Sequence, residues 1–302
     1  MVRSSAKWMN GAARIAALVG LAAAAGCGTA LNYPGNGGPR YAGSPAAGPD
    51  AARRSAPASL RVVTFNTHFA RRVDRVTELL RAERLVDADV VALQEVDARA
   101  TRRIATALGM SYVYYPGAVH PATGRDFGNA VLSRWPIVED WKIVLPHRGS
   151  FRDTQRTATA ATILVGADSL RVYSVHLSTM GEMGPGSRRE QARAVLADAA
   201  RFRRVIVGGD LNSVRLGEEF LACGFRWPTR NNPPTIHFFT WDHIFLRGIE
   251  AGDDPSTGVV DDDNGASDHR PVWAVARFSP PGRPGGEDHP SEGCVPLHQN
   301  RT

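Results

Sequence analysis

The sequence predicts an α/β protein built around a mixed β-sheet. Strand-like and helix-like patterns alternate between residues 60 and 278, and 43% of the 302 residues are hydrophobic. Several of the strand patterns are separated only by tight turns. Because parallel neighbours need a long crossover while antiparallel neighbours can be joined by a short turn, this mixture favours α/β layers around a mixed sheet.

The elements are predicted in chain order from their hydrophobic periodicity. In the first half we expect strands at 59–68, 88–96 and 111–117, a strand from 128 that is stopped by a turn around Trp135 and Pro136, and helices at 71–85 and 100–109, the second ending at Gly109. In the second half we expect strands at 157–165, 170–177, 204–213, 237–246 and 266–278 and helices at 187–202 and 218–224. Ser187, three residues before Glu190, is a candidate N-cap.

Both ends of the chain differ from this region. Arg3, Lys7 and Arg14 accompany an apolar run that ends at Cys27 and is too short to cross a bilayer, which is typical of an export signal at 1–27. The small residues before Cys27 resemble a bacterial lipoprotein box, in which the cysteine is lipidated. We therefore expect an exported protein, lipid-anchored to the bacterial envelope membrane, or secreted if an ordinary signal is cleaved there instead.

The remaining terminal segments are rich in glycine, proline, alanine and serine. Residues 28–58 and 279–302 show no apolar period, so we expect a disordered tether and a disordered tail around one domain at 59–278. Nothing in the sequence calls for an obligate protein partner. Cys223 is expected to be buried, and a disulfide with Cys294 is possible in an oxidising compartment.

The net charge of +6 belongs mostly to the ends of the chain. Residues 1–59 carry six basic and one acidic side chain, and residues 279–302 carry two basic and three acidic ones, so residues 60–278 keep +2. The basic isoelectric point is therefore weak evidence for nucleic-acid binding.

Polar side chains recur where the predicted strands begin or end. Burying several carboxylates and amides there without partners would cost a few kcal/mol each. A cation and an anionic substrate would supply those partners. Carboxylate and amide oxygens without thiolates favour Mg²⁺ or Mn²⁺, although two histidines beside an aspartate could also hold zinc. The residues are Asn66, Glu95, His176, Asp210, Asn212, Asp242, Asp268 and His269.

Seven motifs occur in an order that closely resembles the endonuclease/exonuclease/phosphatase superfamily. They are "TFN", "LQE", "GNAVLSR", "VHL", "GGDLNS", "WDHIFL" and "SDHRPV", and they are spread over roughly 60–276, so the resemblance extends over nearly the whole domain. The superfamily includes base-excision endonucleases, secreted DNases, sphingomyelinases and inositol polyphosphate phosphatases. The resemblance implies a four-layered α/β/β/α sandwich with two mixed β-sheets face to face.

The resemblance also implies metal ligands. Glu95 matches the family's principal metal-binding glutamate, Asn66 matches an asparagine that helps hold the ion, and Asp268 matches a further acidic ligand. His68 stands where base-excision members carry a second acidic ligand, which argues against base-excision activity for this chain without affecting the hydrolytic residues.

Catalytic roles follow in the same way. The resemblance implies that Asp210 orients or deprotonates the attacking water, that Asn212 contacts the phosphate, and that His269 is a general base or a cationic stabiliser. Asp242 would fix the tautomer of His269, and His176 would contact the phosphate.

Two more residues are candidates for phosphate binding. Asn129, in "GNAVLSR", is expected to reach the site. Arg156 resembles an arginine that some members direct at phosphate, and a solvated strand start is the alternative.

The substrate class stays open at this point. We expect Mg²⁺- or Mn²⁺-dependent hydrolysis of a phosphate ester by in-line attack of water, with an extracytoplasmic endonuclease or a non-catalytic binding module as alternatives. Arg71, Arg72, Arg75, Arg125 and Arg134 could contact nucleic acid but equally suit solvated surfaces. The segment 231–241 could present aromatic side chains to lipid, although Phe238 and Phe239 are more typical of a core strand.

Overall fold

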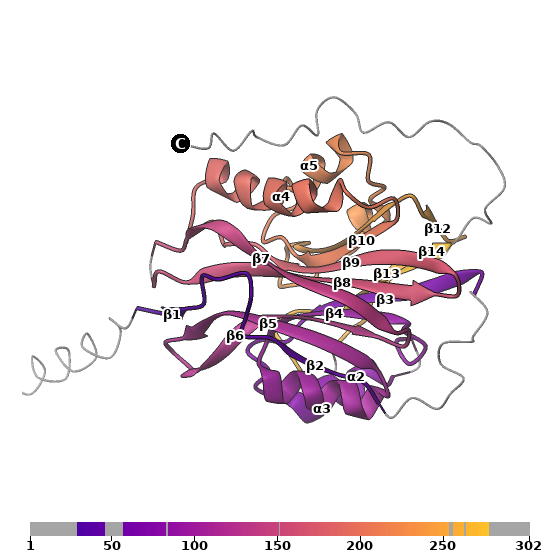
Figure 1. Ribbon diagram of the computed structural model, residues 1–302, viewed down its shortest axis with the longest axis horizontal. Helices are drawn as coiled ribbons and strands as arrows, with labels where there is room; N and C mark the ends of the chain where they lie inside the picture. The colour runs from indigo at the N-terminus through magenta and orange to yellow at the C-terminus, as the bar shows by residue number, and fades with distance from the viewer. Residues whose placement is uncertain are drawn as a thin grey trace, which may run out of the picture.

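The computed structural model describes residues 29–45 and 57–277 except for residues 83, 151, 254, 255 and 263. In Figure 1, two β-sheets lie face to face with helices on both outer sides. The larger sheet has the order β1 (Leu31–Asn32), β5 (Ser111–His120), β6 (Arg125–Ser133), β4 (Val90–Val96), β3 (Ser59–Asn66), β14 (Val272–Arg277) and β12 (Glu250–Ala251), with β2 (Tyr41–Gly43) paired to β5 and β13 (Thr257–Val259) paired to β14.

The smaller sheet has the order β11 (Asp242–Arg247), β10 (Val205–Asp210), β9 (Asp168–His176), β8 (Gln155–Val165) and β7 (Ile137–Arg148). Each sheet contains one parallel pair among antiparallel ones, β3 with β4 and β9 with β10. Both sheets are therefore mixed, as predicted.

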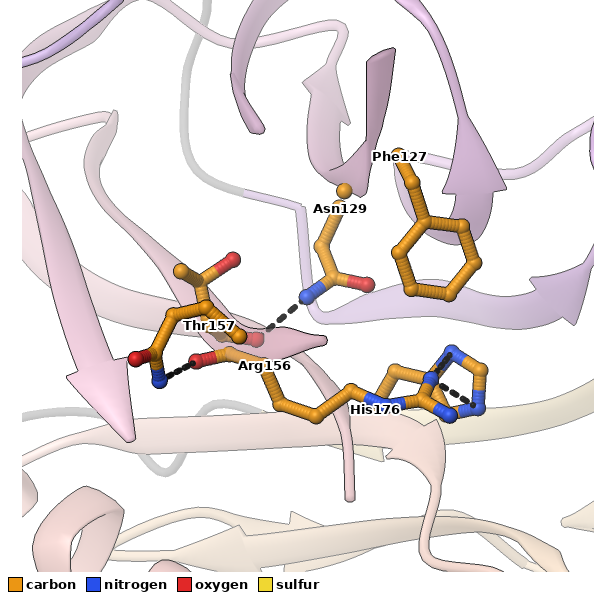
Figure 2. Close-up of a pocket in the computed structure, with 7 residues that line it drawn as sticks. Phe127, Asn129, Arg156, Thr157 and His176 are labelled. Atoms are coloured by element: carbon orange, nitrogen blue, oxygen red, sulfur yellow. Dashed lines mark hydrogen bonds between the residues drawn. The ribbon is translucent and has the colours of Figure 1, made fainter. Parts of the chain in front are cut away.

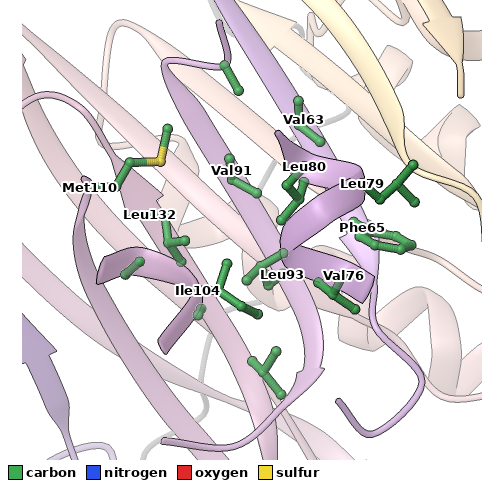
Figure 3. Close-up of a cluster of buried hydrophobic side chains, with 14 of the residues drawn as sticks. Val63, Phe65, Val76, Leu79, Leu80, Val91, Leu93, Ile104, Met110 and Leu132 are labelled. Atoms are coloured by element: carbon green, nitrogen blue, oxygen red, sulfur yellow. The ribbon is translucent and has the colours of Figure 1, made fainter. Parts of the chain in front are cut away.

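Helices cover the outer face of each sheet. α2 (Val73–Leu80) and α3 (Ala98–Leu108) pack on the larger sheet, where Val76, Leu80 and Ile104 contact a buried cluster from β3 and β4 (Figure 3). α4 (Pro185–Ala199) and α5 (Gly217–Ala222) cover the smaller sheet (Figure 1), and a short 3₁₀ helix, η2 (Pro228–Asn231), lies against β11.

A third apolar layer lies between the sheets. Strands of both sheets bury aliphatic side chains there, among them Val62, Val131, Ile163, Val172 and Ile206. Because each sheet buries both faces, its strands are almost continuously apolar, which is why they were visible in the sequence. The structure confirms the expected four-layered sandwich.

The structure differs from the predicted tether at residues 29–45. β1 and β2 pair with β5, on the side of that strand opposite β6. Between them, the carbonyls of Tyr33 and Gly38 accept hydrogen bonds from the fully buried ammonium of Lys142 in β7. Glycine- and proline-rich composition predicted disorder, but partners far along the chain hold this segment across the edges of both sheets. The rest of the tether, the signal, Cys27, and the tail lie outside the described residues.

One strand was missed and two local predictions were wrong. β7 was not predicted, because its half-exposed residues alternate irregularly. Ser187 is not the N-cap of α4, since the helix begins earlier, at Pro185 after Gly184. The expected strand at 237–246 begins only at Asp242, and the residues before it form a tight turn in which Phe238 is 78% exposed. No helix among the described residues is long and apolar enough to cross a membrane.

Candidate active site

The predicted site residues lie at one edge of the two facing sheets. Asn66, His176 and Asp210 end β3, β9 and β10, which puts them at the carboxyl ends of parallel pairs. Asp242 begins β11 directly opposite Asp210, since those two strands are antiparallel. His269 precedes β14, which runs antiparallel to β3, so it enters the same edge.

Glu95 reaches this edge through an irregularity in β4. The pairing of β4 with β6 shifts register between Leu93 and Val96, and Glu95 has a positive φ of 55°. Such a bulge re-aims one side chain, and a left-handed backbone at a non-glycine residue is costly unless its surroundings impose it. The Glu95 carboxylate accepts hydrogen bonds from Phe69 N at 3.1 Å and Asn66 Nδ2 at 3.4 Å.

Asn66 joins Glu95 to a second buried carboxylate. Its Nδ2 also donates to Asp210 Oδ2 at 3.0 Å, while its Oδ1 accepts from His68 N at 3.1 Å. Burial raises the pKa of Glu95. Burial, together with the charge of Asp242, raises the pKa of Asp210 to about 7. Because the carboxylates of Glu95 and Asp210 are both buried, their charged forms need a nearby positive charge for stabilisation.

His269 supplies part of that charge. Its Nδ1 is 2.8 Å from Asp242 Oδ2, and its Nε2 is 3.7 Å from Asp210 Oδ2. Burial alone would lower the pKa of His269, but the carboxylates of Asp242 and Asp210 raise it to about 10. The imidazole is therefore cationic at neutral pH, with its Nε2 edge facing the site.

His176 is a neutral imidazole beside the same carboxylates. Its Nε2 lies 3.5 Å from Asp210 Oδ2 and 3.9 Å from Glu95 Oε1. Burial and the charge of Arg156 hold the pKa of His176 well below its usual value. Figure 2 shows the Arg156 guanidinium against the His176 ring, with one nitrogen 3.0 Å from both ring nitrogens. Arg156 is thus part of the buried site rather than a solvated strand start.

Asn129 lines the same narrow pocket as Arg156 and His176 (Figure 2). Its Nδ2 donates to the carbonyl of Thr157, while its Oδ1 is buried without a hydrogen-bond partner in the described part of the chain. The Arg156 Nε and Thr157 Oγ1 atoms are likewise buried and unpartnered there. Gly128 permits this arrangement, because a Cβ would lie 2.2 Å from the carbonyl oxygen of Tyr115. The pocket presents unsatisfied polar atoms suited to a polar ligand.

Asn212 and Asp268 complete the predicted set. Asn212 N donates to Asp210 Oδ1 at 2.7 Å, and its side-chain amide donates to Leu177 O at 2.9 Å, so the amide is held in the loop after β10. Asp268 is more exposed and lies 3.4 Å from His68 Nδ1.

The oxygen donors fit a hard divalent cation. In the predicted ligand set of Glu95, Asn66 and Asp268, the two acids supply carboxylates, and the Asn66 amide contacts the carboxylates of Glu95 and Asp210. To offer its oxygen instead of its nitrogen, Asn66 would have to rotate and release His68 N. Among the described residues, the one group of carboxylate and imidazole ligand atoms that all lie within 4.8 Å of one another is formed by Asp210, Asp242 and His269. Since Asp242 and His269 already hydrogen-bond each other, we favour the first set.

Two positioning residues were not recognised in the sequence. Arg188, in α4, is buried and donates to the carbonyls of Ser178 and Asn212, which fixes the loops after β9 and β10. Glu182 accepts a hydrogen bond from Arg156 Nη2 at 2.7 Å. Arg188 looked like any polar residue of an amphipathic helix, and Glu182 lies in a glycine-rich loop, so neither had a local signal.

Comparison with known proteins gives a consistent answer. The model of the endonuclease/exonuclease/phosphatase family matches residues 63–269. An endonuclease/exonuclease/phosphatase from Beutenbergia cavernae DSM 12333 shares the fold at 24% identity and a TM-score of 0.60, over 74% of this chain and 72% of that one. Sphingomyelinase C from Streptomyces griseocarneus shares it at 20% identity and a TM-score of 0.56, over 73% of this chain and 99% of that one.

A curated relative is similar over a shorter stretch. The anhydro-N-acetylmuramic acid kinase of Acidithiobacillus ferrooxidans is 29% identical over 119 residues, which are 39% of this chain. The match spans only 28% of that kinase, so the similarity does not extend to the kinase as a whole protein. The family model, by contrast, covers more than half of this chain and both sheets that carry the site. The chain therefore belongs to the endonuclease/exonuclease/phosphatase family, whose members are hydrolases of phosphoester bonds and generally depend on divalent metal ions.

Proposed function

We propose that the protein is a Mg²⁺- or Mn²⁺-dependent hydrolase of phosphate esters in which water attacks phosphorus in line. One observation supports this most directly. A carboxylate whose pKa is raised to about 7, Asp210, lies within 3.7 Å of a cationic imidazole, His269, and within 3.5 Å of a neutral one, His176. This combination can accept a proton from water and stabilise negative charge within one pocket.

Each residue has a role in this proposal. Asp210 accepts the proton of the attacking water, because a base with a pKa near the working pH is the most effective. His269 faces a phosphoryl oxygen and stabilises the charge that develops there, with Asp242 holding its ring. Arg156, Asn129 and Asn212 bind the phosphate.

A divalent cation held by Glu95, Asn66 and Asp268 would neutralise charge on the phosphoryl oxygens. We expect EDTA to abolish hydrolysis of a chromogenic phosphodiester by the purified protein and Mg²⁺ or Mn²⁺ to restore it. Glu95→Gln should require a metal concentration at least about tenfold higher for half-maximal rate, since it loses one charged ligand. Hydrolysis that continues undiminished in EDTA would contradict the proposal.

The substrate is to be found by a screen with plasmid DNA, RNA, sphingomyelin and inositol phosphates, each with added metal. Nicking of plasmid would indicate an endonuclease, and release of choline phosphate would indicate a lipid phosphodiesterase. If every substrate and the chromogenic diester bind without turnover, the chain is a binding module on the same fold.

We also propose that the protein is exported and attached to the bacterial envelope membrane through Cys27. The basic head, the short apolar run and the small residues before Cys27 support this. In a bacterial host, the wild-type chain should incorporate labelled palmitate and sediment with membranes, and Cys27→Ser should do neither. Labelling of Cys27→Ser equal to that of the wild type would exclude this anchor.

A further inference from the structure

A cleft of about 410 Å³ lies beside the candidate active site, between the first turns of α2 and α3. Its walls also include Asp74 and Asp97. Around these two acids stand six arginines, which is a large local excess of positive charge in a domain whose net charge is close to neutral. The arginines are Arg71, Arg72, Arg75, Arg99, Arg103 and Arg125.

Only two of these arginines have a carboxylate partner among the described residues. Arg103 pairs with Asp74, and Arg125 pairs with Asp97 at 3.0 Å. Arg72 and Arg75 donate to main-chain carbonyls, those of Gly265 at 2.6 Å and Asn264 at 2.7 Å. Carbonyl bonds orient a guanidinium but leave its charge uncompensated.

The remaining two guanidiniums are the least engaged. Arg71 lies over the ring of Phe69, with its guanidinium carbon 5.3 Å from the ring centroid. Within the described ranges, the Arg99 guanidinium makes no hydrogen bond or ion pair. Both side chains can therefore turn toward a ligand without breaking an existing polar contact.

The cleft shares a wall with the candidate metal site. Phe69 N donates to Glu95 Oε2 at 3.1 Å on one side, and Phe69 O accepts from Arg125 Nη2 at 2.5 Å on the other. Asp97, which lines the cleft, comes two residues after Glu95. A ligand that reaches the site from this side passes the arginines first.

We propose that this cleft binds a second, non-scissile phosphate group of the substrate, an inference that rests on the proposed phosphoesterase function. Guanidinium groups suit phosphate because their planar donors bind two oxygens at once. The second phosphate could belong to the next nucleotide of a nucleic-acid strand or to another position of a polyphosphorylated small molecule. Both sources offer the same chemistry to the cleft.

Binding of inorganic tripolyphosphate tests the cleft without requiring activity. Isothermal titration in EDTA, with His269→Ala in an otherwise complete chain, should show salt-dependent binding. Adding Arg71→Ala and Arg99→Ala should weaken it by about tenfold or more. Adding Arg81→Ala and Arg102→Ala instead removes the same charge at the end of α2 and on α3, outside the cleft, and should leave binding within about twofold. Equal losses in both double variants, or no binding at all, would overturn the proposal.

Kinetics then identify the source of the second phosphate. In the active protein, Arg71→Ala with Arg99→Ala should raise KM about tenfold for a single-stranded oligonucleotide or for an inositol polyphosphate, and leave kcat/KM of a chromogenic diester unchanged. A loss confined to binding of anionic phospholipid vesicles would instead mean a membrane-facing surface and overturn the proposal. If tripolyphosphate binds as expected but no ester is hydrolysed, the proposed function fails while the anion cleft stands.

Discussion

His269→Ala is expected to lower kcat for phosphate-ester hydrolysis by about 10³-fold or more while the protein stays folded. The imidazole contributes a full positive charge at Nε2, and no other cationic imidazole among the described residues faces Asp210, since burial and Arg156 keep His176 neutral. Initial rates with a chromogenic diester and circular dichroism of the same preparations provide the measurement. His147→Ala removes an exposed histidine that pairs with Glu190 and should keep the parental rate.

Asp242→Asn separates the two roles that the sequence left open for His269. The pKa of His269 is about 10 because the carboxylates of Asp242 and Asp210 outweigh burial. Without the charge of Asp242, less negative charge offsets the effect of burial, which disfavours the imidazolium, and the pKa of His269 falls. If the imidazolium is the active form, the alkaline limb of the kcat profile must move to lower pH. If the neutral imidazole were the base, the acidic limb would move instead and activity near neutrality would gain, which contradicts the assignment made here.

Much of this edge could be predicted because the fold forces it. Strands buried on both faces are recognisable as apolar runs, and a polar residue that ends such a run must lie at the sheet edge. Asn66, His176 and Asp210 were found this way. Their mutual contacts could not be predicted from periodicity alone, because the Asp210–Asn66 and His269–Asp242 bonds join residues far apart in sequence. The family resemblance supplied that information.

Other parts of the molecule left no local signal. Glu95 faces the site only because a bulge and a left-handed backbone turn it there, and neither is encoded by a glycine. The segment 29–45 looks like a linker because its glycines and prolines have no apolar period, yet the buried charge of Lys142 depends on its carbonyls. The arginine cleft combines residues that, taken separately, look like solvated helix faces. In each case the determining partner is distant in sequence.

Asp210→Asn should abolish hydrolysis and at the same time stabilise the fold. The buried carboxyl of Asp210 has its pKa raised to about 7 from an ordinary value of 3.8. Between pH 3.8 and about 7, the folded protein therefore keeps the Asp210 proton that the unfolded chain has already lost. The free energy of unfolding falls as pH rises through this range, and the full loss is reached above it. An amide does not ionise, but its nitrogen cannot accept the hydrogen bond that Asp210 Oδ2 accepts from Asn66 Nδ2, so only part of this loss is recovered. At one pKa unit per about 1.36 kcal/mol, and with relaxation around the charge, we expect a gain of about 1–3 kcal/mol at pH 8.

Denaturant unfolding in EDTA at two pH values checks this expectation. At pH 8 Asp210→Asn should exceed the parent in free energy of unfolding. At pH 5 only the part of the window between 3.8 and 5 has been crossed, so the gap should shrink to about 40% of its value at pH 8. Asp253→Asn, whose side chain is 85% exposed, should show no such gain at either pH. The rate should fall about 10³-fold, because the amide can still accept the Asn212 N–H bond but cannot take a proton from water. A variant that is both less stable at pH 8 and still active would mean that Asp210 stabilises the fold through its hydrogen bond with Asn66 and does not accept a proton in the reaction.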